Sequence, residues 1–276
     1  MSESKHNRRT QRTKRAIYTA FAELLSEKEL HKITVQELVD RADIGRATFY
    51  THYLDIYDLN EKINASMTTA KVVGGDLYDY HILDNGSVFV AIGDVSGKGI
   101  TAALFMARAI TLLNNYAKLG YSPAKMLFEF NNNLAAHNPN MMFITAFVAI
   151  YHPQTGELIY SNAGHNYPYI ISDKLTALNT ENGIIAGSFE DVAFPEYTVK
   201  MKPGDCLFMY TDGVTEAENK SGELFGETQL EEVLHKNKAC GADNLLNAVT
   251  AEINGFAQES EQSDDMTMLA LQIKPD

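Results

Sequence analysis

The sequence contains no tryptophan and only two cysteines, Cys206 and Cys240. Two cysteines this far apart provide neither a disulfide framework nor the paired spacing of a zinc site. The N-terminus is charged and lacks the apolar core of a signal peptide. The longest apolar run, 141–151, is interrupted by Thr145 and is too short to span a bilayer, which takes about 20 residues. We therefore expect a reduced, cytoplasmic protein with no membrane partner.

Basic residues are scarce outside the N-terminal part of the chain. The 276 residues carry a formal net charge of -13. Residues 1–62 hold 11 Lys and Arg against 10 Asp and Glu, whereas residues 63–276 hold 12 against 26. The length favours two domains. The charge pattern indicates an end that suits nucleic acid and a body that repels it, although a solvated basic tail alone explains the charge run more simply.

The first 63 residues show the patterns of short helices. Apolar residues at helical spacing predict an amphipathic helix over about residues 9–26. These are Ile17, Phe21, Leu24 and Leu25. Thr34 and Glu37 can form a capping box at the start of a second helix, which reaches about Ala42. A turn over 43–45, with Gly45 free to take a positive φ, leads to a third helix over 46–53. Two short helices around such a turn predict a helix-turn-helix.

The third predicted helix carries hydrogen-bonding groups on its outer face, which suits phosphate oxygens and base edges. They are Arg46, Thr48, Tyr50, Thr51 and His52. The stretch ITVQELVDRADIGRATFYTHY resembles the tetracycline-repressor (TetR) family of DNA-binding domains. The resemblance implies that Tyr50 and His52 contact phosphate, and that Arg46, Thr48 and Thr51 lie near bases. DNA is thus a candidate partner of residues 1–62, and a helical bundle without a ligand is the alternative.

Residues 64–276 mix strand and helix patterns. Strands are predicted near 87–92, 143–151, 157–161, 206–211 and 267–273, and helices near 99–119, 122–137, 227–237 and 242–257. The helix over 99–119 is apolar almost all round and is expected to be buried. Strands clustered around helix pairs favour two sheets between helices over alternating βαβ units. The predicted fold class is α+β.

Aspartates recur beside these strands. Asp76 and Asp79 lie in GGDLYDY, Asp94 in GDVSGKG, Asp212 in TDGVTEA, and Asp264 and Asp265 in SDDMT. Any one of them is most simply a turn residue. If they converge, the carboxylates repel one another unless protons or cations neutralise them. Because Mg²⁺ and Mn²⁺ prefer oxygen ligands, the set predicts a divalent metal site.

These motifs resemble the PPM serine/threonine protein phosphatases of the SpoIIE and RsbU type. The resemblance also includes ASMTTAKVVGGDLYDY, GDVSGKGITAALFMA, SNAGHNYP and GDCLFMYTDGVTEAEN, and it covers about residues 65–274. It implies a layered β-sandwich flanked by helices over 64–276, after a small all-α helix-turn-helix domain over 1–63.

The same resemblance implies two Mn²⁺ or Mg²⁺ ions and a set of residues around them. Asp94 would bridge the ions and the carbonyl of Val95 would join one of them. Asp76 would bind on one side, and Asp212 and Asp264, with Asp265 adjacent, on the other. Asp76 and Asp94 are thereby the expected catalytic residues. Water activated by the two ions would attack phosphorus without a covalent intermediate.

Two functions stay open from the sequence. The first is a phosphatase that acts on a phosphoserine or phosphothreonine protein and is attached to a DNA-binding segment. The second is a transcriptional regulator whose phosphatase-like domain serves only for sensing or binding. Lys98 is either a group that helps to hold phosphate or a solvated loop residue. His165 either shapes the site or is a satisfied structural histidine.

Overall fold

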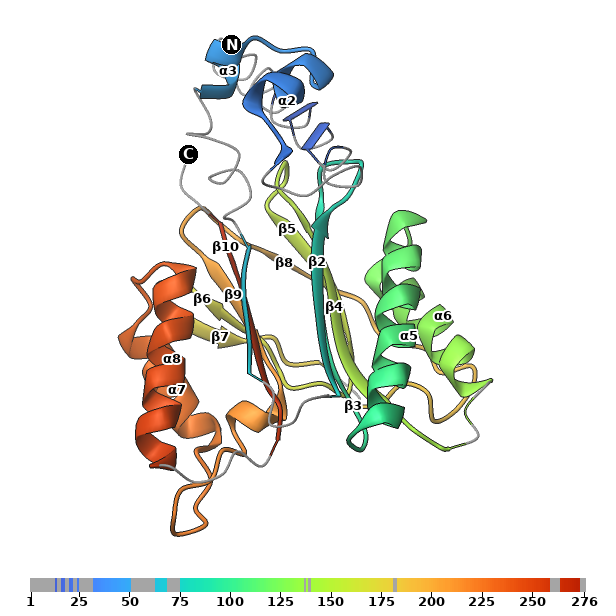
Figure 1. Ribbon diagram of the computed structural model, residues 1–276, viewed down its shortest axis with the longest axis vertical. Coiled ribbons are helices and arrows are strands. Elements are labelled where there is room, and N and C mark those ends of the chain that lie inside the picture. The colour runs from blue at the N-terminus through green and yellow to red at the C-terminus, as the bar shows by residue number, and fades with distance from the viewer. Residues whose placement is uncertain are drawn as a thin grey trace.

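The computed structural model describes residues 13, 16, 17, 20, 21, 24, 32–50, 63–136, 138, 140–180, 183–258 and 264–273, except 69–74. Two five-stranded antiparallel sheets lie face to face, and a helix pair covers the outer face of each (Figure 1). Within this part of the chain no helix is both long and apolar enough to cross a membrane.

The first sheet has the strand order β2-β3-β4-β5-β8. Its strands are β2 (Asp76–Ile82), β3 (Val88–Val95), β4 (Ile144–His152), β5 (Glu157–Ala163) and β8 (Tyr197–Lys200). Helices α5 (Ile100–Lys118) and α6 (Pro123–Ala135) pack against it. The side chains of β3 and β4 alternate between the helices and the opposite sheet, so Phe89 faces α5 and α6 while Val90 faces the inter-sheet core.

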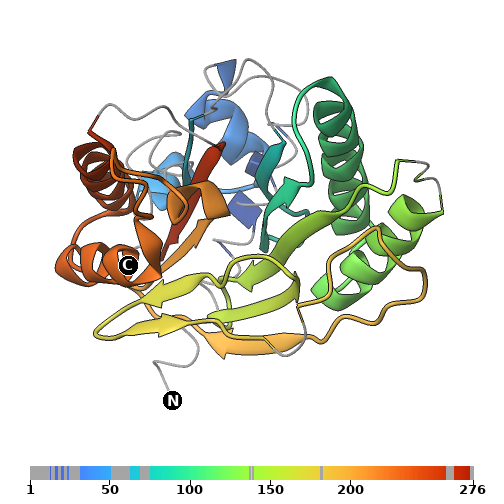
Figure 2. The same ribbon diagram turned by 90° about the horizontal axis from the view of Figure 1, so that it is seen from below.

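The second sheet has the strand order β1-β10-β9-β6-β7. Its strands are β1 (Ile63–Thr68), β6 (Tyr169–Ile171), β7 (Leu175–Ala177), β9 (Cys206–Tyr210) and β10 (Met266–Gln272). Helices α7 (Gly226–Lys236) and α8 (Ala242–Ala257) cover its outer face, and Figure 2 shows the resulting four layers. The chain is therefore an α+β sandwich, as its strand and helix patterns predict.

The N-terminal helices lie at one end of the sandwich (Figure 1). Two of them are described in full, α2 (Val35–Arg41) and α3 (Arg46–Tyr50). The predicted capping box is present, since Glu37 N donates to Thr34 Oγ1 at 3.3 Å and Thr34 N donates to Glu37 Oε2 at 3.0 Å. Their core packs against Ile82 at the far end of β2. The start of β2 at Asp76 points to the opposite end of the molecule.

Several sequence-based expectations were wrong. The positive φ in the turn between α2 and α3 belongs to Asp43 (51°) and not to Gly45, because a short polar side chain also tolerates the left-handed region. Helix α5 is not buried all round: Ile100 is 75% exposed and Leu104 is 69% exposed. Only one face of α5 meets the sheet, so apolar residues on its other face stay in contact with water.

Strands β2, β6, β7 and β8 were not predicted. The last three are only three or four residues long. Strand β2 contains aspartates and begins at a residue that we interpreted as part of a turn. Tyr78, Tyr80 and Ile82 favour a strand, and pairing with β3 keeps the aspartates between them in the ladder.

Candidate functional site

Asp76 and Asp94 face each other across the β2–β3 ladder, at the end of the sandwich opposite α2 and α3. Gly75 precedes β2 and brings the two strands together at this point. A Cβ built on Gly75 would lie 3.0 Å from the carbonyl oxygen of Val95 and 3.4 Å from Asp94 Oδ1. The first sheet thus contributes two carboxylates and a nearby backbone carbonyl, three of the predicted ligands.

The second sheet contributes the other three carboxylates. Asp212 starts the 3-10 turn η2 (Asp212–Val214) after β9, and Asp264 and Asp265 precede β10. Strands β9 and β10 are neighbours, so the two segments meet. Gly213 allows the contact, because a Cβ there would lie 1.9 Å from the carbonyl oxygen of Asp265. Sequence positions 52 residues apart, Gly213 and Asp265, are brought together in this way.

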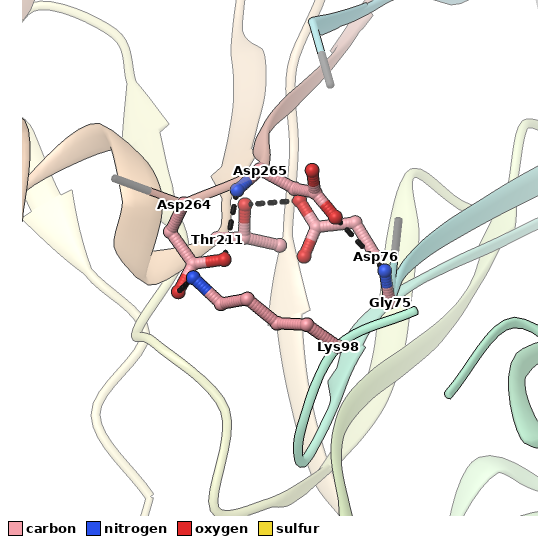
Figure 3. A network of polar contacts seen from close by, with 6 residues as sticks. All are labelled: Gly75, Asp76, Lys98, Thr211, Asp264 and Asp265. Atoms are coloured by element: carbon pink, nitrogen blue, oxygen red, sulfur yellow. Dashed lines mark hydrogen bonds and ion pairs between the residues drawn. The ribbon is translucent and has the colours of Figure 1, made fainter. Parts of the chain in front are cut away.

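Hydrogen bonds tie the two halves of the site to each other (Figure 3). Thr211 Oγ1 donates to Asp76 Oδ2 at 2.7 Å, and Gly75 N donates to Asp265 Oδ2 at 2.8 Å. The Thr211 hydroxyl also accepts from Thr267 N at 3.0 Å. Asp265 therefore orients the backbone at Gly75 as well as lying beside Asp76. We had not singled out Thr211, although its place between β9 and Asp212 was a usable signal.

The carboxylates are close enough to perturb one another. Burial, together with the charges of Asp76, Asp212 and Asp264, raises the pKa of Asp94 to about 8. Burial raises the pKa of Asp76 to about 7, despite the hydrogen bond from Thr211. The pKa of Asp212 is raised by burial and by the charge of Asp264. In the absence of cations, the folded protein thus disfavours full ionisation of this cluster.

The chemistry of the donors fits hard divalent cations. Every donor in the cluster is a carboxylate or carbonyl oxygen, and a bound cation relieves the repulsion that raises these pKa values. Among the described residues, no three His, Cys, Asp or Glu side chains are arranged to hold one metal ion by themselves. Mg²⁺ commonly binds through one or two carboxylates and keeps several waters, so it does not need three side chains from the protein.

Two residues singled out in the sequence lie apart from the carboxylate cluster. Asp79 sits in the middle of β2, where it accepts hydrogen bonds from Tyr80 N and Asn114 Nδ2. His165 is buried, its Nδ1 is 2.9 Å from Thr145 Oγ1, and burial lowers its pKa to about 4. Asp79 links β2 to α5, and His165 is buried beside the strand pair that carries Asp94.

The predicted DNA-contacting residues are placed in part. Arg46 and Tyr50 are exposed on α3, and Thr48 is half-buried. Arg46 Nη2 donates to the Tyr50 hydroxyl at 3.4 Å, so the two side chains lie together. Thr51 and His52 are outside the described residues. DNA binding by this segment stays a prediction.

Replacing Thr211 by valine is expected to destabilise the metal-free protein by about 1–3 kcal/mol, because valine keeps the volume but leaves Thr267 N and the Asp76 carboxyl without their partner. Urea unfolding monitored by circular dichroism measures the change. Thr211→Ser keeps the hydroxyl and should restore most of the stability. Equal unfolding midpoints for the valine variant and the wild type would contradict the assignment.

Comparisons with known proteins identify relatives of this chain. The family model of stage II sporulation protein E (SpoIIE) matches residues 84–274. Protein IcfG of Synechocystis sp. is 31% identical over 247 residues, covering 79% of this chain and 39% of IcfG. Phosphoserine phosphatase RsbU of Bacillus subtilis is 28% identical, covering 77% of this chain and 63% of RsbU. The chain thus spans less than two thirds of either relative.

A solved structure shares the fold. The SiaA-PP2C domain of Pseudomonas aeruginosa superposes with a TM-score of 0.70 at 21% identity, covering 78% of this chain and 87% of that domain. The matched family region contains Asp94, Asp212, Asp264 and Asp265. From the converging carboxylates, the double-sheet sandwich and a family match that spans most of its length, this chain belongs to the SpoIIE family.

Proposed function

We propose that this chain is a metal-dependent serine/threonine protein phosphatase of the PPM type. The observation that carries the proposal is the convergence of carboxylates from both sheets at one end of the sandwich, with Asp94 at their centre. Placing several buried carboxylates side by side is unfavourable, because each one disfavours ionisation of its neighbours. A purely structural role does not explain such a cluster. The name of RsbU, a phosphoserine phosphatase, supports the same assignment.

Asp94 would contact both ions. Asp76 and the carbonyl of Val95 would bind on one side, and Asp212 and Asp264, with Asp265 adjacent, would bind on the other, with water as the remaining ligands. When bound, Mn²⁺ or Mg²⁺ ions supply positive charge and lower the pKa of water for in-line attack on phosphorus. The hydrogen bond from Thr211 fixes one oxygen of Asp76, and Asp265 fixes the backbone at Gly75. These contacts would orient the ligands before a metal ion binds.

The overall reaction balances as a hydrolysis. A bond forms between phosphorus and a water oxygen, and the bond from phosphorus to the seryl or threonyl oxygen breaks. The leaving oxygen takes a proton, and the products are a free hydroxyl group and inorganic phosphate.

The direct test is hydrolysis of p-nitrophenyl phosphate and of a phosphoserine peptide by the full chain, with Mn²⁺, with Mg²⁺ and with a chelator. We expect turnover that depends on the added ion. Mn²⁺ binding without any turnover would favour the alternative, a regulator in which this domain only binds or senses. Absence of Mn²⁺ binding would exclude the metal site itself.

A second activity, DNA binding, is favoured by one observation. Helix α3 follows α2 after a short turn, and its Arg46 and Tyr50 side chains are exposed together. Such a pair can contact phosphate oxygens and base edges. The acidic body would restrict the contact to this end of the molecule.

Replacing Tyr50 by alanine is expected to weaken binding of the full chain to a random-sequence duplex by about 3- to 10-fold at low salt, because one phosphate hydrogen bond is lost and Arg46 loses its neighbour. A gel shift at several salt concentrations measures this. Tyr167→Ala, at another exposed tyrosine, is the matched control. Full binding by the Tyr50 variant would contradict the role of α3.

A further inference from the structure

Lys98 lies in the loop between β3 and α5, in the motif GDVSGKG. Its neighbours Gly97 and Gly99 both have positive φ angles, 87° and 84°. Nothing lies within 4 Å of a Cβ built at either glycine, so these glycines serve the backbone turn and not close packing. The turn aims the Lys98 side chain away from its own sheet. Figure 3 shows it stretched towards the loop that precedes β10.

The ammonium group of Lys98 ends beside a proposed metal ligand. Lys98 Nζ is 3.0 Å from Asp264 Oδ2, and the two side chains are 42% and 34% exposed. Its positive charge also acts on the carboxyls of Asp212 and Glu216. An ion pair with this much exposure is weak and exchanges readily. The structure thus has a positively charged side chain at the place where a divalent ion would need the same carboxylate.

A positive side chain close to the carboxylate cluster would favour binding of a substrate phosphate, and among the described residues the arginine of the sandwich is committed elsewhere. Arg108 is the only arginine after residue 46. Its guanidinium donates to the Asn133 carbonyl oxygen at 2.5 Å and to Asn133 Oδ1 at 2.8 Å, on the helix pair α5 and α6. Lys98 is a long, flexible lysine already at the carboxylate cluster. Lysine binds phosphate as a point charge from variable directions, so it tolerates a change of partner.

We propose that Lys98 exchanges between two anionic partners: the Asp264 carboxylate in the metal-free protein, and the phosphoryl group of the substrate once Asp264 holds a metal ion. This inference rests on the proposed phosphatase function and deepens it. In the metal-free state Lys98 neutralises part of the acidic cluster and competes with the incoming cation. In the loaded state repulsion from the cation drives the ammonium off Asp264 and towards the phosphate dianion.

The two roles predict effects of opposite sign for one substitution. Lys98→Gln removes the competing charge, so the full chain should bind Mn²⁺ about 1.5- to 5-fold more tightly in the absence of phosphate. The same variant should bind inorganic phosphate at least about 10-fold more weakly at saturating Mn²⁺. Isothermal titration calorimetry measures both affinities, and neither readout requires turnover.

Two matched variants accompany it. Lys236→Gln removes an exposed lysine from α7, where Nζ lies 3.7 Å from Glu232 Oε2, and should leave both affinities unchanged. Lys98→Arg keeps the charge and should keep most of the phosphate affinity. A damaged fold would weaken the binding of both Mn²⁺ and phosphate. The proposed exchange of partners instead strengthens Mn²⁺ binding and weakens phosphate binding.

The inference is overturned if Lys98→Gln fails to tighten Mn²⁺ binding or fails to weaken phosphate binding. This outcome is separable from failure of the proposed function. If the wild-type chain hydrolyses p-nitrophenyl phosphate but Lys98→Gln changes neither affinity, only the proposed role of Lys98 is wrong. If Lys98→Gln tightens Mn²⁺ binding and weakens phosphate binding but the wild type hydrolyses nothing, the exchange of partners holds and the phosphatase assignment is wrong.

Discussion

Asp94→Asn is expected to lower Mn²⁺-dependent hydrolysis of p-nitrophenyl phosphate by at least about 100-fold. Residues that only support metal ligands cost up to about 100-fold when replaced, and a direct ligand should cost at least as much. Asp94 lies opposite Asp76, and its carboxyl is influenced by the charges of Asp76, Asp212 and Asp264. Asparagine keeps the shape but removes the negative charge that would neutralise two cations. Initial rates at saturating Mn²⁺ measure the effect.

The fold should survive this substitution, and the pH dependence of stability shows why. Burial and its acidic neighbours raise the pKa of Asp94 to about 8 in the folded protein, from the ordinary aspartate value of about 3.9. Between these two values the folded state binds more protons than the unfolded state, so the contribution of Asp94 to stability falls as pH rises. Asparagine removes this penalty, and at pH 8 the metal-free variant should melt no lower than the wild type.

Asp79→Asn is the matched control for Asp94→Asn. Asp79 lies in the same strand pair, but its carboxylate accepts from Tyr80 N and Asn114 Nδ2 and takes no part in the cluster. Its activity should stay close to that of the wild type. If Asp94→Asn retained wild-type turnover while binding Mn²⁺ normally, the central role of Asp94 would be wrong.

Gly213→Ala is expected to destabilise the protein by at least about 3 kcal/mol, because its Cβ would lie 1.9 Å from the carbonyl oxygen of Asp265. The carbonyl oxygen of Asp265 belongs to the backbone, so it cannot move aside as easily as the end of a flexible side chain. The turn carrying Asp212 must therefore separate from the segment that carries Asp264 and Asp265. Urea unfolding of the metal-free protein measures the loss, and Mn²⁺ affinity should fall with it.

Gly255→Ala provides the control for Gly213→Ala. Gly255 is an exposed residue of α8, and nothing lies within 4 Å of a Cβ built there. Alanine at this helical position should stabilise the protein by up to about 1 kcal/mol. An unfolding midpoint for Gly213→Ala equal to that of the wild type would show that the turn and the SDDM segment are not in such close contact.

Much of the architecture was predictable from local patterns. The long helices and strands with regular apolar spacing were predicted within a few residues, as α6, α7, α8, β4, β5 and β9 show. The capping box at Thr34 and Glu37 marked the start of α2 correctly. Short edge strands such as β7 and β8 were missed because three or four residues carry too little periodicity, and their pairing partners are distant in sequence.

The identities of the acidic residues were present in the sequence, because hard cations require oxygen donors whatever the fold. Their neighbours in space were not. Only the pairing of β2 with β3 and of β9 with β10, together with the close approach at Gly213, brings the five carboxylates together. The same packing separates Asp79 from the others, since successive side chains of a strand point to opposite faces.

The amino-acid sequence by itself thus determined most of the long helices and strands and which metal-binding side chains are available, because helix periodicity, caps and carboxylate chemistry are local properties. Tertiary structure alone decided which carboxylates meet, that Thr211 holds Asp76, and that Lys98 reaches Asp264. The physical reason is that these contacts join segments more than a hundred residues apart, and their geometry depends on how two sheets pack and not on any single stretch of sequence.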